Sequence, residues 1–184
     1  MVRLVAAVAV IFLVWPQGVL AQETAEEGDV LAEAIARNPD RLKDRLVDLV
    51  AGFGQDGGLT AEGIAEYIAI ERAGARAAGL RRYLAMDLDA DGSIDGEEMS
   101  AVQRAASAAS RGRMVRDFAA ADANGDGRVD AAEIAAAGQA AALRSLDEAE
   151  ADLLRAAMRL DANSDGRLTP REVTEGIARL AEAG

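Results

Sequence analysis

One twelve-residue segment, 87–98, constrains the fold of this chain more than any other part of the sequence. Oxygen-bearing side chains stand at its positions 1, 3, 5, 9 and 12, which are Asp87, Asp89, Asp91, Asp95 and Glu98. Position 6 is Gly92, where a sharp turn is possible that a Cβ would resist. Short acidic side chains at alternate positions converge on one point if the backbone curls around it. Because calcium prefers six to eight oxygen ligands, the segment predicts a calcium-binding loop.

The same pattern recurs twice at similar spacing. Segment 122–133 carries Asp122, Asn124, Asp126, Asp130 and Glu133 at these positions, and segment 161–172 carries Asp161, Asn163, Asp165, Thr169 and Glu172. Asp87 and Asp122 are 35 residues apart, and Asp122 and Asp161 are 39 apart. One such match could be an acidic surface loop, but three matches at this spacing favour an internal repeat. These segments are called loops II, III and IV below.

On these motifs the sequence resembles the EF-hand proteins of the calmodulin-like superfamily, over most of the chain after its N-terminal segment. The resemblance implies an all-α fold of helix–loop–helix units in two pairs. Short antiparallel bridges between paired loops would join their position 8 residues. It also implies Ca²⁺ at three sites, with Ser93, Arg128 and Arg167 at position 7 adding backbone carbonyls to the ligands.

A fourth segment, 52–63, falls into the same frame 35 residues before loop II and is called loop I. Glycines replace the ligands at its positions 1, 3 and 12, so it predicts a degenerate unit that is retained for packing and holds no calcium. A glycine-rich linker is the alternative. Pairing neighbours along the chain predicts bridges from Leu59 to Ile94 and from Val129 to Leu168. Residues 107–113 would then be a hinge or bent helix between the pairs.

The first 21 residues have the pattern of a secretory signal peptide. Arg3 precedes an apolar run over 4–15, and the small residues Val19 and Ala21 indicate cleavage after Ala21. An uncleaved anchor is disfavoured because the run is shorter than the roughly 20 residues that a membrane span needs. We therefore expect a periplasmic or secreted protein without stable membrane association after cleavage. The excess of arginine over lysine weakly suggests a GC-rich bacterium.

The expected domain organisation follows from these segments. It comprises a signal peptide (1–21), an N-terminal lead with a short helix (22–38), an EF-hand pair with loops I and II (39–108), and an EF-hand pair with loops III and IV (109–184).

Charge and composition narrow the function classes. The net charge of −12 argues against nucleic acid and anionic membranes as partners. With no histidine and no cysteine, the chain lacks Ser-His-Asp and Cys-His nucleophile systems and the usual zinc ligands. We therefore expect a non-enzymatic protein. An enzyme that uses paired carboxylates is a weaker hypothesis.

Two roles for calcium remain open. Calcium is expected to act as a structural or buffered ligand, and the alternative is a sensor or adaptor that docks an unidentified protein partner when loaded. Methionines are few, so the apolar helix positions favour a core over a target-binding groove. Arg111 and Arg113 favour a solvated helix face over a docking patch. Loop IV has the fewest acidic ligands, which predicts the weakest calcium affinity there.

Overall fold

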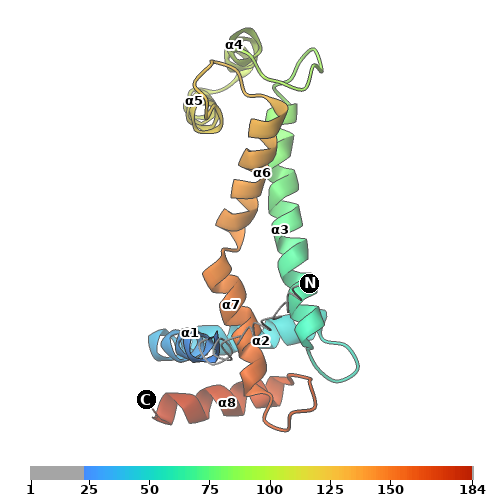
Figure 1. Cartoon of the computed structure of the whole chain (residues 1–184), viewed down its shortest axis with the longest axis vertical. Helices are drawn as coiled ribbons and strands as arrows, with labels where there is room; N and C mark the ends of the chain where they lie inside the picture. Colours follow the sequence, from blue (N-terminus) through green and yellow to red (C-terminus); the bar gives the residue numbers. More distant parts are fainter. Residues whose placement is uncertain (1–22, 184) are drawn as a thin grey trace, which may run out of the picture.

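The computed structural model describes residues 23–183, and every regular element in that range is helical (Figure 1). The elements are α1 (Glu23–Arg37), α2 (Pro39–Phe53), α3 (Ala61–Leu84), α4 (Gly96–Ala105), α5 (Ala108–Ala121), α6 (Ala131–Ser145), α7 (Glu148–Ala156), η1 (Ala157–Leu160) and α8 (Pro170–Ala183). The predicted all-α fold of helix–loop–helix units is confirmed. Among the described helices, none is both long and apolar enough to cross a bilayer. The predicted signal peptide lies outside the described residues.

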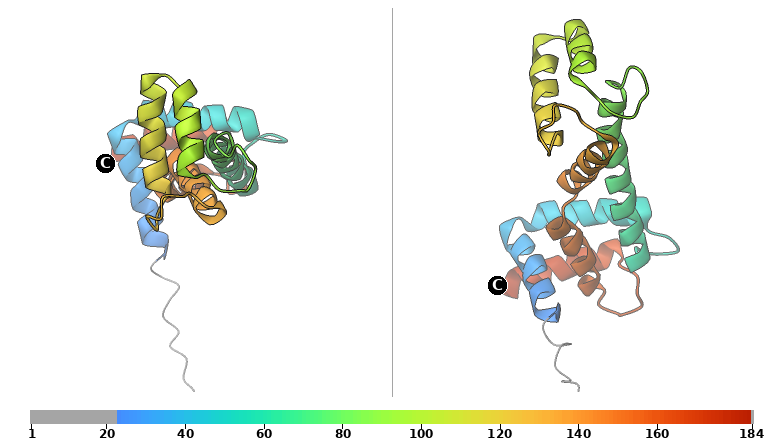
Figure 2. Two further views of the ribbon diagram at one scale, coloured as in Figure 1. Left: turned by 90° about the horizontal axis from the view of Figure 1, so that it is seen from above. Right: turned by 45° about the horizontal axis from the view of Figure 1, so that its top comes forward.

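The helices form two lobes at opposite ends of an elongated molecule (Figures 1 and 2). We name the lobes by the position of their helices in the sequence. The outer lobe contains α1, α2, α7, η1, α8 and the start of α3, which come from both ends of the chain. The inner lobe, from the middle of the chain, contains α4, α5, the end of α3 and the start of α6. Each lobe has its own cluster of buried apolar side chains. Helices α3 and α6 run between the lobes and pack against each other.

The N-terminal helices belong to the outer lobe. Helix α1 begins at Glu23, so almost all of the segment predicted as a lead with a short helix is one helix. Asn38 then caps α2, since its side chain accepts a hydrogen bond from the Arg41 amide (3.0 Å). Helix α2 has one apolar face, since Leu42, Leu46, Leu49 and Val50, spaced by 4, 3 and 1 residues, are all buried.

The loops pair differently from the prediction. Isolated antiparallel bridges join Leu59 to Leu168 and Ile94 to Val129, so loop I pairs with loop IV and loop II with loop III. All four of these position 8 residues have an exposed fraction of 0%. The predicted bridges from Leu59 to Ile94 and from Val129 to Leu168 are therefore wrong. The predicted boundary between residues 108 and 109 falls in the first turn of α5, inside the inner lobe.

The length of α3 explains this pairing. Its 24 residues form one uninterrupted helix from loop I to loop II. At a rise of 1.5 Å per residue such a helix is about 36 Å long, so it holds these two loops at opposite ends. Loops II and III can meet because α4 ends at Ala105 and Ser107 caps α5. Residues 106–107 thus form a turn within the inner lobe, and the predicted hinge between pairs does not lie there.

The region where α6 gives way to α7 is tied to α3. Helix α6 ends at Ser145, and Asp147 caps α7 by accepting a hydrogen bond from the Glu150 amide (2.8 Å). Leu146, between these two helices, is buried in the apolar core of the outer lobe. The Nε of Arg72 on α3 donates to the Leu146 carbonyl (2.9 Å), and its Nη1 pairs with Glu148 (3.1 Å). These contacts fix the point at which α6 ends and α7 begins.

The crossing of α3 and α6 depends on two glycines. A Cβ built on Gly79 would lie 2.9 Å from the Ala141 Cβ and 3.6 Å from the Gly138 Cα. A Cβ on Gly138 would lie 2.8 Å from a methyl carbon of Leu80. Non-bonded carbon atoms are normally 3.5–4.0 Å apart, so this helix contact requires the absence of both side chains.

Gly79→Ala is expected to lower the free energy of unfolding by about 1–3 kcal/mol, because the new methyl group meets a Cβ that cannot rotate away. Gly74→Ala is the matched control on the same helix, since a Cβ there meets nothing within 4 Å. Alanine should stabilise the helix at that site by roughly 0.5–1 kcal/mol. Urea denaturation of both variants measures the difference, and equal effects would show that α3 and α6 do not pack this closely.

Candidate metal centre

The three ligand-rich loops share their connection to the helix that follows. Each of these helices, α4, α6 and α8, begins at loop position 10. The position 9 side chains of Asp95, Asp130 and Thr169 accept hydrogen bonds from the amide of position 12, at 3.0, 2.9 and 3.2 Å. These residues cap the helices because the first turn of a helix has free amide donors.

The position 12 glutamate of each loop folds back over that loop. In loop II the Oε1 of Glu98 accepts a hydrogen bond from the Leu88 amide (2.6 Å), and its Oε2 accepts one from the Asp95 amide (3.0 Å). Glu133 makes the same two contacts in loop III with the amides of Ala123 (2.9 Å) and Asp130 (3.1 Å). In both loops this glutamate also completes the capping box of the following helix.

Glu172 holds the same place in loop IV with a hydroxyl partner. The amide and the Oγ1 of Thr169 both donate to its Oε2, at 3.0 and 2.8 Å. These bonds, led by the one from the hydroxyl, hold the pKa of Glu172 below its usual value. The side chain is therefore ionised at neutral pH, which is the form that binds a cation.

The position 1 aspartates point into the loops. Their Oδ2 atoms accept hydrogen bonds from the position 6 amides, Gly92 to Asp87 (3.1 Å), Gly127 to Asp122 (3.1 Å) and Gly166 to Asp161 (2.8 Å). Those glycines have φ of 85°, 82° and 78°, a left-handed conformation that side chains disfavour. The Oδ1 atoms of Asp87 and Asp161 are buried and have no hydrogen-bond partner within the described residues. Because a buried carboxylate oxygen without a partner is destabilising, a cation fits these two positions.

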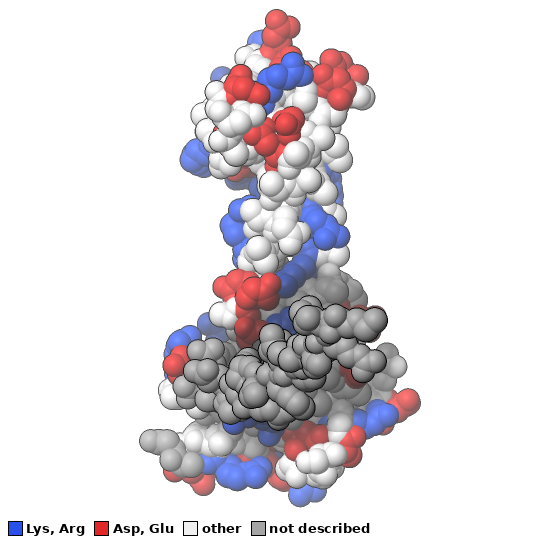
Figure 3. Space-filling view, viewed as in Figure 1, with Lys and Arg blue, Asp and Glu red and all other residues white. Residues whose placement is uncertain are grey.

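Loop II gathers the most negative charge. Carboxylate oxygens of Asp87, Asp89 and Asp91 lie within 4.8 Å of one another. The pKa of Asp91 is lowered, chiefly by a hydrogen bond from the Ser93 hydroxyl (2.8 Å), so these like charges repel unless a cation lies among them. In loops III and IV an amide replaces one carboxylate, and Asn124 and Asn163 donate to Asp126 (3.0 Å) and Asp165 (3.1 Å). In Figure 3 acidic side chains form clusters on the inner lobe.

The position 7 residues follow one pattern in the three loops. The amides of Ser93, Arg128 and Arg167 each donate to the position 5 aspartate of their own loop, at 2.8, 2.9 and 2.9 Å. Together with the contacts above, these bonds bring each set of predicted ligands into one loop. The backbone therefore curls in the same way in all three loops.

The two arginine side chains at position 7 have a role that sequence reasoning missed. Arg128 reaches from loop III to loop II, where its Nη2 pairs with Asp91 Oδ2 (3.2 Å) and contacts the Ser93 hydroxyl. Arg167 reaches from loop IV to loop I, where its Nη1 donates to the carbonyls of Gln55 (2.9 Å) and Asp56 (3.3 Å). The shared arginine at position 7 of loops III and IV was the available signal. It becomes informative only when the paired loops are known.

Loop I contains a tight turn in place of a ligand ring. Helix α2 continues to Phe53, and Gln55 and Gly58 then form an antiparallel bridge around Asp56 and Gly57. Both turn residues have positive φ, 46° and 107°, as a two-residue hairpin turn requires. The prediction that loop I would be a degenerate unit agrees with this geometry, since α2 and α3 flank the turn and Leu59 packs against loop IV. The guanidinium group of Arg167 covers the turn's carbonyls with a fixed positive charge.

Helix–loop–helix units whose loops converge acidic side chains define a class of metal-binding protein. The family model described as EF hand matches residues 84–103 and 115–136, which contain loops II and III with parts of their flanking helices. These two segments are therefore EF hands, and the match supports calcium binding by this protein. No curated protein and no solved structure matches the chain.

Arg128→Ala is expected to strengthen calcium binding at loop II by up to about fivefold, because it removes a cation from the ligand Asp91 and an exposed ion pair is worth up to about 1 kcal/mol. Arg104→Ala is the control, since it removes one positive charge from α4 in the same lobe, away from the loops. Calcium titration of the three proteins by calorimetry measures the change. Equal affinities for the two variants would mean that only net charge matters.

Proposed function

We propose that this protein binds three calcium ions in loops II, III and IV, and that calcium acts as a structural or buffered ligand in a non-enzymatic protein. The observation that carries the proposal is the pair of buried, unpartnered oxygens on Asp87 and Asp161. In both loops the other oxygen of the same carboxylate is held by a glycine amide. Each aspartate is thus oriented with one oxygen that remains to bind a cation.

Loop III offers the same kinds of ligand atom, which supports a calcium site there as well. In all three loops these atoms favour calcium over other metals. The side chains offered by the loops are carboxylates, amides and hydroxyls, which suit hard cations such as calcium. In each loop a ring of short side chains faces one glutamate with two oxygens available. Bound calcium would replace the repulsion among carboxylates with attraction, and would stabilise the folded state by mass action.

A sensor role is the second candidate, and one cavity favours it. A cavity of about 250 Å³ in the inner lobe lies between α3, α4 and α5. Its lining includes Tyr83, Met86, Val102 and Met114, which are largely apolar and include two methionines. An opening of this cavity upon calcium binding would create a surface for an apolar partner segment.

A calcium titration followed by the fluorescence of a hydrophobic dye distinguishes the two roles, with magnesium as control. We expect calorimetry to count three calcium ions per chain and the dye fluorescence to fall, because a loose calcium-free chain closes around the ions. A rise specific to calcium would favour the sensor role. Absence of any heat or fluorescence response would overturn calcium binding itself.

We also propose export, supported by the signal-peptide pattern of residues 1–21. Exported EF hands meet abundant calcium, and dissociation constants of about 10⁻⁴–10⁻³ M are usual for extracellular modules. Expression in a bacterial host followed by N-terminal sequencing of the periplasmic fraction tests this proposal. The mature chain should begin at Gln22, and an uncut chain in the cytoplasm would contradict the proposal.

A further inference from the structure

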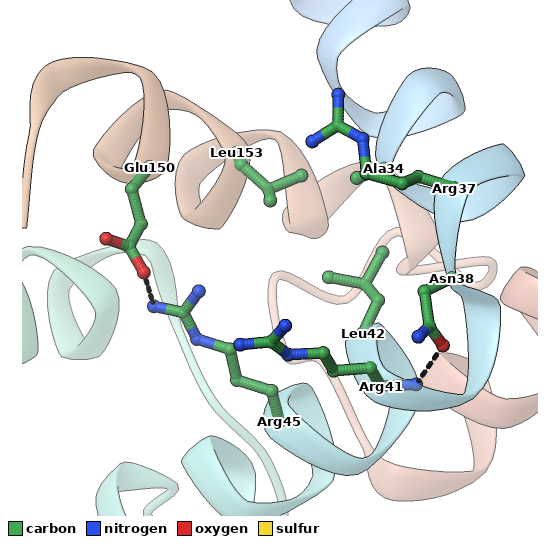
Figure 4. A pocket seen from close by; sticks show the side chains of 8 residues that line it. All are labelled: Ala34, Arg37, Asn38, Arg41, Leu42, Arg45, Glu150 and Leu153. Atoms are coloured by element: carbon green, nitrogen blue, oxygen red, sulfur yellow. Dashed lines mark hydrogen bonds and ion pairs between the residues drawn. The ribbon is translucent and has the colours of Figure 1, made fainter.

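A basic cavity lies in the outer lobe, away from the calcium loops. It has a volume of about 350 Å³ and is formed by α1, α2 and α7 (Figure 4). Its lining consists of Ala34, Arg37, Asn38, Arg41, Leu42, Arg45, Glu150 and Leu153. Three arginines therefore meet at one hollow of a chain whose net charge is −12.

The positive charge in this cavity is only partly balanced within the protein. Arg45 pairs with Glu150 (2.5 Å), which also lines the cavity. Among residues 30–182, no ion pair involves Arg37 or Arg41. In Figure 4 the Arg41 and Arg45 side chains extend from α2 along one side of the cavity, and the Arg37 guanidinium group lies on the α1 side. The cavity thus has an excess of positive charge and of hydrogen-bond donors.

The position of Arg41 in its helix argues against a purely local role. Arg41 is the third residue of α2, after Pro39 and Asp40, and α2 is 15 residues long. A cation in the first turn of a helix is unfavourable, because the free amides there carry partial positive charge. Arg37 differs, since it lies in the last turn of α1, where a cation is favourable. An anion bound to Arg41 would offset this unfavourable placement.

Apart from Asn38 and Glu150, the remaining wall of the cavity is apolar. Leu42 is 7% exposed, and Leu153 and Ala34 pack against the same core. Two further hollows share its lining, one beside Val30 and Ala149 and one beside Phe53 and Tyr67, and each adds one acidic residue to that lining, Glu33 and Asp48 respectively. The hollows together could accommodate a ligand with an apolar body that extends from its charged group. A volume of about 300–1,000 Å³ is usual for small-molecule sites.

We propose that this cavity binds a small organic anion with an apolar body, such as a medium-chain carboxylate. Arg41 binds the anionic group through charge-assisted hydrogen bonds, and Leu42 and Leu153 contact the apolar body. The Arg45–Glu150 pair forms the far wall of the site. This site is independent of the calcium loops, so the proposal stands or falls separately from the proposed function.

The test is a titration of the ¹⁵N-labelled full chain with sodium octanoate at fixed calcium, followed by NMR. We expect saturable shifts of the amides of residues 37–45 and 150–153. Arg41→Ala should weaken octanoate binding by about tenfold to 100-fold, as expected for losing hydrogen bonds to a charged group. Arg104→Ala, on the inner lobe, should bind octanoate as the wild type does. Both variants should keep wild-type calcium stoichiometry, which shows that they are folded.

Octanol and sulfate complete the test. Both should bind at least about tenfold more weakly than octanoate, because octanol lacks the charge and sulfate lacks the apolar body. Octanoate binding that Arg41→Ala leaves unchanged, or shifts confined to other residues, would overturn the proposal. Equal affinity for sulfate would do so too, since the site would then recognise simple anions. Tighter binding of a hexaglutamate peptide than of octanoate would overturn the proposal, because the cavity would then bind an acidic chain segment instead.

Discussion

Glu98→Gln is expected to lower the calcium affinity of loop II by about 100-fold or more. Glu98 spans loop II, with one oxygen on the Leu88 amide and the other on the Asp95 amide, and is the candidate that would bind the ion through both oxygens. Glutamine keeps the size of the side chain but removes the charge and one of the two acceptor oxygens. Loss of groups that merely orient metal ligands already reduces affinity about 10–100-fold, so a direct ligand should matter at least as much.

Calorimetry with calcium would check this by counting the sites filled at moderate calcium concentration, which should fall from three to two. Glu97→Gln is the matched control, because it makes the same change one residue earlier at an exposed position. Glu133→Gln and Glu172→Gln extend the series to loops III and IV. Three filled sites in Glu98→Gln would refute the ligand role of Glu98. A tightest site at loop IV would refute the predicted order of affinities.

Leu59→Ala is expected to lower the free energy of unfolding of the outer lobe by about 2–5 kcal/mol. The Leu59 side chain is fully buried, and its amide and carbonyl form the bridge to Leu168, at 2.9 and 2.8 Å. Truncation leaves a cavity beneath loop IV. Calcium binding at loop IV should therefore weaken, while loops II and III keep their affinities because they belong to the other core cluster.

Two variants serve as controls for Leu59→Ala. Ile94→Ala removes the corresponding side chain from the inner lobe, where Ile94 bridges to Val129, and should weaken loops II and III but not loop IV. Leu88→Ala lies at a position that is 59% exposed and should change little. Thermal unfolding with calcium titration of each variant gives the readout. Weakened binding at loop II in Leu59→Ala would show that loops I and II are paired after all.

Local structure could be predicted from the sequence because neighbouring residues determine it. The periodic oxygen ligands predicted loops II, III and IV, and Asp95, Asp130 and Thr169 cap the following helices as their side chains favour. The glycines of loop I predicted a unit without ligands. The apolar spacing over residues 42–50 predicted the buried face of α2. Each of these predictions depends on residues within about one helical turn or one loop.

The tertiary structure decided which loops meet and what their arginines contact. In sequence order loop II is next to loop I, but the unbroken α3 separates the two by its full length, so loop I instead meets loop IV. The cross-loop contacts of Arg128 and Arg167 exist only because of that pairing. Likewise, Arg37, Arg41 and Leu153 line one cavity only because α1, α2 and α7 pack together. The sequence by itself determined the candidate ligand positions and the helices around them. The continuity of α3 decided which loops pair, because a rigid helix of 24 residues cannot bring its two ends together.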